Sequence, residues 1–167
     1  LTLRSNTTPD ELGCKFSLPA TMQVNGVRFY TPPNVWGASA QFEVIIYSAL
    51  DQVLVTKTVS DKDFMDNTAA GDVFFAPITL QANTAYRVVS KPTVSTGGDI
   101  YLQRYQFESA NAKAAWPPAD SAWQGTSRTD GGAWTDQATE LTCIGLWVND
   151  LTLTAPAGAG GGASAHL

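Results

Sequence analysis

Apolar and polar residues alternate along most of this chain, and such alternation indicates short strands with one buried face. In residues 12–18, Leu12, Cys14 and Phe16 fall on one side of the alternation, whereas Lys15 falls on the other. Successive side chains of a strand point to opposite faces of its sheet. This segment therefore predicts a half-buried strand that ends at Pro19.

The most apolar run lies at residues 41–49 and has apolar residues on both faces. Phe42 and Val44 share one face, and Ile45 and Tyr47 share the other, so we expect this strand to be covered on both sides. A tight connection at 50–52 predicts a hairpin with a strand at 53–59. Further strands are expected at 21–30, 73–79, 85–91, 99–107, 121–128 and 141–149.

About nine strands without a long helical pattern predict an all-β fold. We expect two antiparallel sheets packed as a β-sandwich, and we favour a jelly-roll-like order because short two-residue hairpins are rare here. Pro77 cannot donate a backbone hydrogen bond, so the strand at 73–79 is expected at a sheet edge. Residues 108–119 are rich in Ala and have room for one helical turn.

The chain divides into three predicted regions. We expect an N-terminal arm at 1–11, the β-sandwich domain at 12–150 and a Gly/Ala-rich tail or linker at 151–167. The tail alone cannot bury enough apolar surface to offset the entropy lost on ordering it. A neighbouring subunit is one candidate for holding the tail, and a plain linker is the other.

Composition indicates a globular domain and argues against two classes of partner. The 167 residues are 44% hydrophobic and 15% charged, with a formal net charge of −5. The apolar content is too high for a disordered chain. No apolar run reaches the about 18 residues of a membrane span. A net negative chain without Lys/Arg clusters also argues against nucleic acid, so we expect neither a membrane nor a nucleic acid as partner.

Histidine content limits the catalytic options. His166 is the only histidine and stands in the tail, whereas Ser-His-Asp triads, Cys-His pairs and His-ligated zinc sites need an imidazole in the body of the fold. The phosphate-loop, dinucleotide and nucleophile-elbow motifs are missing from the sequence. Carboxylate chemistry remains, but nothing marks Glu43 and Glu108 as partners. We therefore expect that the protein is not an enzyme and that it binds no cofactor.

Two groups of residues could hold a metal ion or a disulfide. Asp61, Asp63 and Asp66 are weak Ca²⁺ candidates; a solvated loop is the favoured alternative because the EF-hand spacing is missing. Cys14 and Cys143 lie in the first and last predicted strands, which are often neighbours in a sandwich. A disulfide would then fit, but we favour two buried thiols.

Aromatic residues are the more informative candidates for binding. Trp36 and Trp116 lie in predicted loops, where exposed aromatic rings stack on sugars or anchor protein interfaces. The candidate ligand or interface residues are Trp36, Trp116, Tyr101 and Tyr105. For Trp123 and Trp134 we favour inward strand or strand-edge positions that close the sandwich.

Three stretches are informative in combination. They are residues 8–19, residues 80–93, and residues 127–136 followed by 144–146. In that order and at those distances they resemble a β-sandwich module in virion proteins of tailed bacteriophages and prophages, over about residues 8–150. They also resemble, more loosely, sandwich domains of bacterial secreted and surface proteins. Residues 139–143 depart from the phage pattern, which often has a basic residue and Pro there.

Within these stretches two features have a direct physical interpretation. Asp130, Gly131 and Gly132 are expected to supply the positive-φ positions of a hairpin. Gly145 is expected to allow a close backbone or aromatic approach in the last strand.

The resemblance implies a non-catalytic structural protein of the virion, such as a capsid decoration, fibre or tail-appendage module. It would act through contacts with other virion subunits, as a homo-oligomer with a trimer favoured. The alternative is a carbohydrate-binding module of a secreted or surface protein, with a host-surface glycan as ligand. A third class, a carboxylate enzyme, would need two carboxyl groups about 5–10 Å apart in a cleft.

Overall fold

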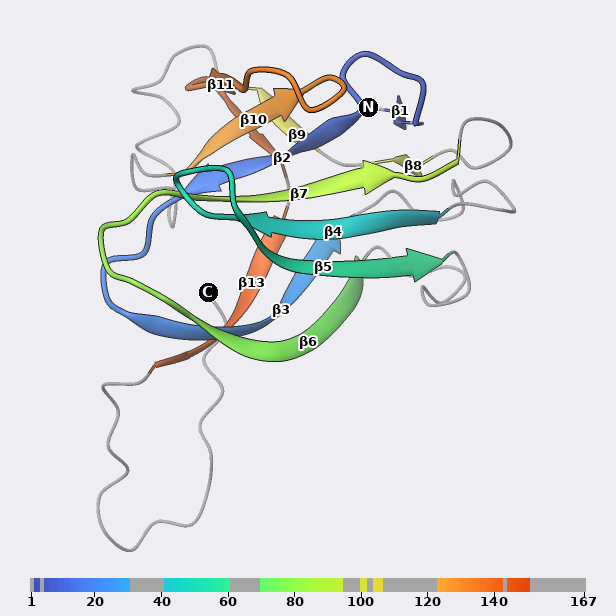
Figure 1. Cartoon of the computed structure of the whole chain (residues 1–167). Coiled ribbons are helices and arrows are strands. Elements are labelled where there is room, and N and C mark those ends of the chain that lie inside the picture. Colours follow the sequence, from blue (N-terminus) through green and yellow to red (C-terminus); the bar gives the residue numbers. More distant parts are fainter. Residues whose placement is uncertain are drawn as a thin grey trace, which may run out of the picture.

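The fold is seen in a computed structural model that describes residues 2–3, 5–30, 41–60, 70–94, 100–101, 104–106, 123–142 and 144–150. These residues form strands and turns, and their two main antiparallel sheets pack face to face (Figure 1). The predicted two-sheet β-sandwich is therefore confirmed, and the two main sheets together hold nine strands. The described segments include no helix long and apolar enough to cross a membrane.

The larger sheet has six strands. In spatial order they are β11 (Thr135–Gln137), β10 (Gln124–Arg128), β2 (Glu11–Phe16), β7 (Tyr86–Pro92), β4 (Gln41–Tyr47) and β5 (Val53–Ser60). The hairpin predicted at 41–59 is confirmed as β4 and β5, with Asp51 at φ 59° in its turn. The β10–β11 hairpin turns through Asp130 (φ 51°) and Gly131 (φ 68°), as their sequence predicts.

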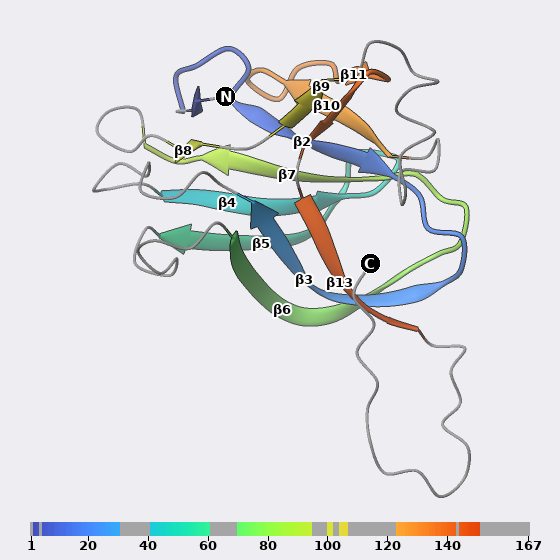
Figure 2. The same cartoon turned by 180° about the vertical axis from the view of Figure 1, so that it is seen from behind.

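The smaller sheet has three strands, which lie side by side in Figure 2. In spatial order they are β13 (Ile144–Asp150), β3 (Met22–Tyr30) and β6 (Ala70–Leu80). Pro77 lies within β6 at the sheet edge, as predicted. Two short ladders complete the described strands: β1 (Thr2–Leu3) with β8 (Ile100–Tyr101), and β12 (Glu140–Thr142) with β9 (Arg104–Gln106).

The strand pairing is nested in the manner of a jelly roll. β2 pairs with β7 (Leu12 opposite Ser90), β3 with β6 (Met22 opposite Leu80), and β4 with β5. This is the pairing of one long antiparallel hairpin folded across itself: its base (β2 and β7) and its tip (β4 and β5) lie in the larger sheet, and its middle (β3 and β6) lies in the smaller sheet. β4 also pairs with β7, and this pairing joins the β4–β5 hairpin to the rest of the larger sheet.

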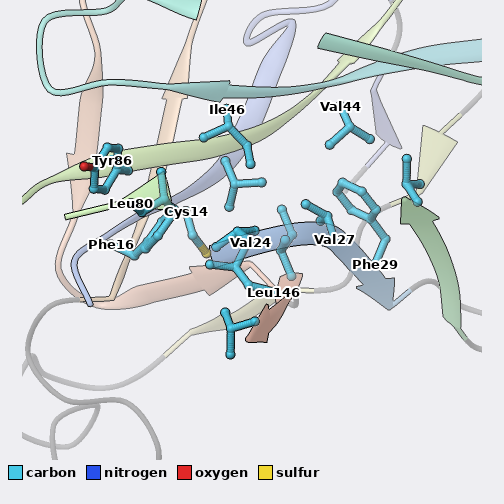
Figure 3. Close-up of a cluster of buried hydrophobic side chains, with 14 of the residues drawn as sticks. Cys14, Phe16, Val24, Val27, Phe29, Val44, Ile46, Leu80, Tyr86 and Leu146 are labelled. Atoms are coloured by element: carbon cyan, nitrogen blue, oxygen red, sulfur yellow. The ribbon is translucent and has the colours of Figure 1, made fainter. Parts of the chain in front are cut away.

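The core fills the space between the two sheets (Figure 3). Phe29 of β3 meets Phe42 of β4 edge to face, with ring centroids 5.6 Å apart, so this aromatic pair joins the two sheets. Phe16 stacks on Trp123 at 4.8 Å, which confirms the inward position predicted for Trp123. Full burial of each such side chain contributes about 1.5–3 kcal/mol, so this core is the main source of stability.

Several predicted boundaries were wrong. The strand expected at 99–107 appears as β8 and β9, and the strand expected at 141–149 appears as β12 and β13. Neither β1 nor β11 was predicted, because two or three residues are too few to show a period of two. The helical turn expected at 108–119 and the tail at 151–167 lie outside the described residues.

Candidate functional site

Most of the predicted site residues fall outside the part of the chain that the structure describes. These residues are Trp36, Asp61, Asp63, Asp66, Trp116 and Cys143. Tyr101 and Tyr105 belong to β8 and β9, where the backbone alone is described; they pair with Thr2 and Leu141. Their roles in binding therefore stay predictions. Among the described residues, no group of three or more His, Cys, Asp or Glu could hold a metal ion.

Cys14 points into the core, as the alternation predicts. Its Sγ donates to the carbonyl oxygen of Thr142 at 3.1 Å, and Thr142 Oγ1 donates to the carbonyl oxygen of Gly13 at 3.0 Å. These contacts attach β12 to β2. Pairing of Cys14 with Cys143 stays a prediction, because Cys143 lies outside the described residues.

A buried ionic cluster lies on the outer face of the larger sheet. It consists of Glu11, Tyr47, Lys91 and Arg128, from β2, β4, β7 and β10. Arg128 Nε lies 3.0 Å and Lys91 Nζ 3.5 Å from Glu11 Oε1. Tyr47 OH donates to Glu11 Oε2 at 3.0 Å and accepts a hydrogen bond from Arg128 Nη2 at 2.7 Å.

The ionic cluster is positioned to hold strands together. Burial, followed by the nearby Glu11 carboxylate, raises the pKa of Tyr47 to about 12, so its hydroxyl stays protonated and donates to Glu11. Glu11 is 0% exposed, which keeps its carboxylate away from any external ligand. We interpret this cluster as structural: it joins four strands whose residues are far apart in sequence.

Trp134 covers this face from outside the sandwich and directly precedes β11 at the edge of the larger sheet, so of the two positions expected for it, inward or strand-edge, it occupies the strand-edge one. The guanidinium groups of Arg87 and Arg128 lie 4.9 Å and 4.2 Å from the centroid of its ring. It also meets Tyr47 edge to face at 5.5 Å, and its Nε1 donates to Asp51 Oδ1 at 2.7 Å. The outer face has apolar residues of its own, and the β10–β11 hairpin brings Trp134 over them.

Asp136 of β11 extends the same covered face. Lys15 Nζ donates to it at 2.7 Å, Arg87 Nη2 at 3.2 Å and Thr126 Oγ1 at 2.6 Å. Burial alone would raise the pKa of this carboxyl. The hydrogen bonds from Lys15 and Thr126 and the charge of Arg87 outweigh burial and hold the pKa below its usual value.

Two other surfaces are accessible. The first is β5, which among the described strands pairs with β4 alone and is exposed along most of its length. Large apolar side chains are exposed at its start and in the preceding turn: Leu50 (82% exposed), Val53 and Leu54. An exposed edge strand offers backbone hydrogen-bonding groups to another chain.

The second accessible surface lies on the outer face of the smaller sheet, and we call it the aromatic strip. Its members are Arg28, Tyr30, Asp72, Phe74 and Trp147. The Phe74 and Trp147 rings lie 5.9 Å apart at 41°, and Phe74 is 55% exposed. Arg28 and Asp72 form a two-bond ion pair beside these rings, at 2.7 and 2.6 Å.

Neither the ionic cluster nor the aromatic strip was predicted, although the sequence contains signals for both. Glu11 and Arg128 belong to two of the three stretches that resemble phage modules. Phe74 alternates with inward neighbours on β6, and Trp147 does the same on β13, which places both rings on the outer face.

Comparisons with protein-family models, curated proteins and solved structures found no match for this chain. The resemblance to virion modules therefore stays a prediction from the residues quoted for it.

Proposed function

We propose that this chain is a non-catalytic structural module of a tailed-phage virion, and that it works through protein–protein contacts made by the exposed edge strand β5. The exposed β5 edge is the main observation in support. The resemblance of the three sequence stretches to virion modules is the second. Its partners would be further copies of itself or other virion subunits.

The two main sheets end in four edge strands, β5, β11, β6 and β13, which differ in how well they are protected against pairing. Natural proteins blunt edge strands by keeping them short or by placing Pro or charged residues on them. β11 has three residues, and β6 contains Pro77. β5 has eight residues with no Pro and one charged residue, Lys57. β13 also lacks Pro, but it is one residue shorter than β5 and its Ile144, Leu146 and Val148 are buried, whereas β5 is exposed along most of its length. β5 is therefore the best suited of the four edges to accept a strand from another subunit.

The geometry of such pairing determines the kind of assembly. Pairing of β5 with β5 of a second copy would give a two-fold dimer, because the same surface is used on both sides. Pairing of β5 with a different edge of the next copy gives a closed ring, of which the favoured trimer is one case, when the rotation between copies closes, and an open filament when it does not. The exposed Leu50, Val53 and Leu54 would add apolar contact area at the end of such an interface.

The test is the solution mass of the chain by light scattering over a range of concentrations. We expect an oligomer for the wild type and a monomer for Thr56→Lys, because a charge on the exposed face of β5 opposes edge pairing. The matched control is Thr135→Lys on β11, an equally exposed threonine at the opposite edge of the same sheet. Both variants should keep the wild-type melting temperature, since surface substitutions change stability by about 0.5 kcal/mol or less.

Two results would contradict the proposal. One is a wild-type chain that stays monomeric at every concentration. The other is a Thr56→Lys variant that keeps the wild-type mass, because β5 would then take no part in assembly. Carbohydrate binding, the alternative from the sequence, is favoured by a different observation, the aromatic strip.

A further inference from the structure

We propose that the aromatic strip on the outer face of the smaller sheet binds a neutral oligosaccharide. The strip lies on a different sheet from β5, and its members do not include Trp36, Trp116, Tyr101 or Tyr105, the residues that the sequence suggested. The strip combines exposed aromatic rings with fixed hydrogen-bonding groups on one face of the sheet.

A glycine creates the aromatic part of the strip. Trp147, Gly26 and Phe74 are direct cross-strand partners on β13, β3 and β6. A Cβ at Gly26 would lie 2.8 Å from Phe74 Cδ1 and 3.1 Å from Trp147 Cδ1, closer than ordinary contact. The missing side chain therefore lets two rings from opposite sides of β3 meet above its backbone, while more than half of Phe74 remains exposed.

The polar part of the strip occupies the next row of partners. Arg28 lies opposite Gly145 on one side and Asp72 on the other. Its Nε and Nη2 donate to the two oxygens of Asp72, and Trp147 Nε1 donates to Asp72 Oδ1 at 2.9 Å. The Arg28 guanidinium also lies 5.0 Å from the Trp147 ring centroid. These contacts fix donors and an acceptor beside the rings before any ligand arrives.

Tyr30 extends the strip along β3 and sets its length. It lies two residues beyond Arg28 on the same face and is also exposed. The distance from the Gly26 row to the Tyr30 row is four residues, or about 13 Å at ~3.3 Å per residue. That span is longer than one sugar ring and suits a short oligosaccharide.

The chemistry of the strip matches a sugar more closely than an ion. A sugar ring has a face of C–H groups that stacks on an aromatic ring and a rim of hydroxyls that needs donors and acceptors. The Arg28 guanidinium has five N–H donors, of which Asp72 takes two, and Arg28 also shares a side-chain hydrogen bond with Tyr30. The charges of Arg28 and Asp72 cancel, which favours an uncharged ligand. Groups already held in place lose little conformational entropy when the ligand binds.

The experiment measures binding of defined oligosaccharides to the full chain by titration calorimetry. The probes are neutral hexasaccharides of β1,4-glucose, α1,4-glucose, β1,4-N-acetylglucosamine and α1,6-mannose, with a galacturonic acid hexamer as the charged comparison. We expect at least one neutral probe to bind, and Phe74→Ala to weaken that binding about tenfold, which corresponds to 1.4 kcal/mol. Thr79→Ala is the matched control, since Thr79 is also exposed on β6 but belongs neither to the strip nor to β5.

A second variant separates ring stacking from stability. Phe74→Leu keeps apolar bulk over Gly26 and removes the flat ring, so it should stay folded and still bind weakly. Three results would overturn the proposal: no binding of any neutral probe at millimolar concentration, binding of the acidic probe alone, or full affinity in both Phe74 variants. A Phe74→Ala variant that lowers the solution mass without changing glycan affinity would identify the strip as a protein interface. The solution-mass test at Thr56 is independent of all these outcomes, because β5 and the strip belong to different sheets.

Discussion

Replacing Glu11 with Gln removes the negative charge at the centre of the buried ionic cluster while keeping the size of the side chain. Arg128 and Lys91 then lose their common carboxylate partner, and Tyr47 donates to a neutral acceptor. The perturbation therefore tests whether four strands of the larger sheet depend on one buried carboxylate.

The burial of the cluster determines how much free energy of unfolding Glu11→Gln is expected to lose. Breaking a buried ion pair by removing one partner costs about 3–5 kcal/mol. Glu11 is 0% exposed, but the Arg128 side chain is 11% exposed and keeps its contacts with the rings of Tyr47 and Trp134. We therefore expect the lower end of that range, about 3 kcal/mol. For a domain of this size each kcal/mol lowers the melting temperature by about 2–4 °C, so the fall should be about 6–12 °C.

The assay is urea unfolding at pH 7, followed by circular dichroism, on Glu11→Gln, Arg128→Met and the double variant. A double-mutant cycle should give a coupling of about 1–3 kcal/mol, because the two side chains are in direct contact. Lys15→Gln is the control: it breaks the Lys15–Asp136 pair on the same face, whose side chains are 30% and 25% exposed. Such a pair is worth about 1 kcal/mol or less. A Glu11→Gln cost as small as that of Lys15→Gln, or a coupling near zero, would refute the reasoning.

Two further predictions concern the substitution of two strand glycines and the stability of the protein at alkaline pH. Gly13→Ala should cost more than about 4 kcal/mol or prevent folding, because its Cβ would lie 1.9 Å from the Val88 carbonyl oxygen and force β2 away from β7. Gly145→Ala should fold normally, since its Cβ would meet only Arg28 Cβ at 3.8 Å. Urea unfolding of the Gly13→Ala and Gly145→Ala variants tests both expectations, and equal stabilities of the two variants would contradict them. The raised pKa of Tyr47 favours the fold below pH 10, and that contribution is lost as pH rises towards 12. Tyr47→Phe should therefore lose stability less steeply than the wild type between pH 10 and 12, and parallel curves of unfolding free energy against pH would show that Tyr47 is not responsible.

The aromatic strip shows what limits prediction of a site from sequence. Alternation in residues 21–30 places Arg28 and Tyr30 on the face opposite Val27 and Phe29, and the structure agrees: Val27 and Phe29 are buried, whereas Tyr30 is exposed. The contact between Phe74 and Trp147 above Gly26 was not predicted, because this contact depends on the register of three strands. Both pairings contain an irregularity, between Val24 and Gly26 on β3 and between Trp147 and Val148 on β13. A bulge changes which residues stand opposite each other, and no local pattern specifies the register of a distant strand.

Glycine positions give the same lesson. Gly145 was expected to mark a close approach, yet its surroundings leave room for a Cβ. The close approaches occur at Gly13, against the backbone of β7, and at Gly26, against two rings. Glycines in strands therefore indicated that a close contact occurs in this fold, but the neighbouring strand determined which glycine makes it.

Local sequence determined the strands and their inward faces in this protein. Leu12, Cys14 and Phe16 alternate in the sequence and are buried together in the structure, because a period of two is a property of the strand itself. Tertiary structure alone decided what covers the outer faces. Glu11 is fully buried and Trp134 lies outside the sandwich because the β10–β11 hairpin folds across β2, more than a hundred residues away in sequence. Burial of a strand's second face depends on its neighbours, and those neighbours exist only once the distant strands have paired.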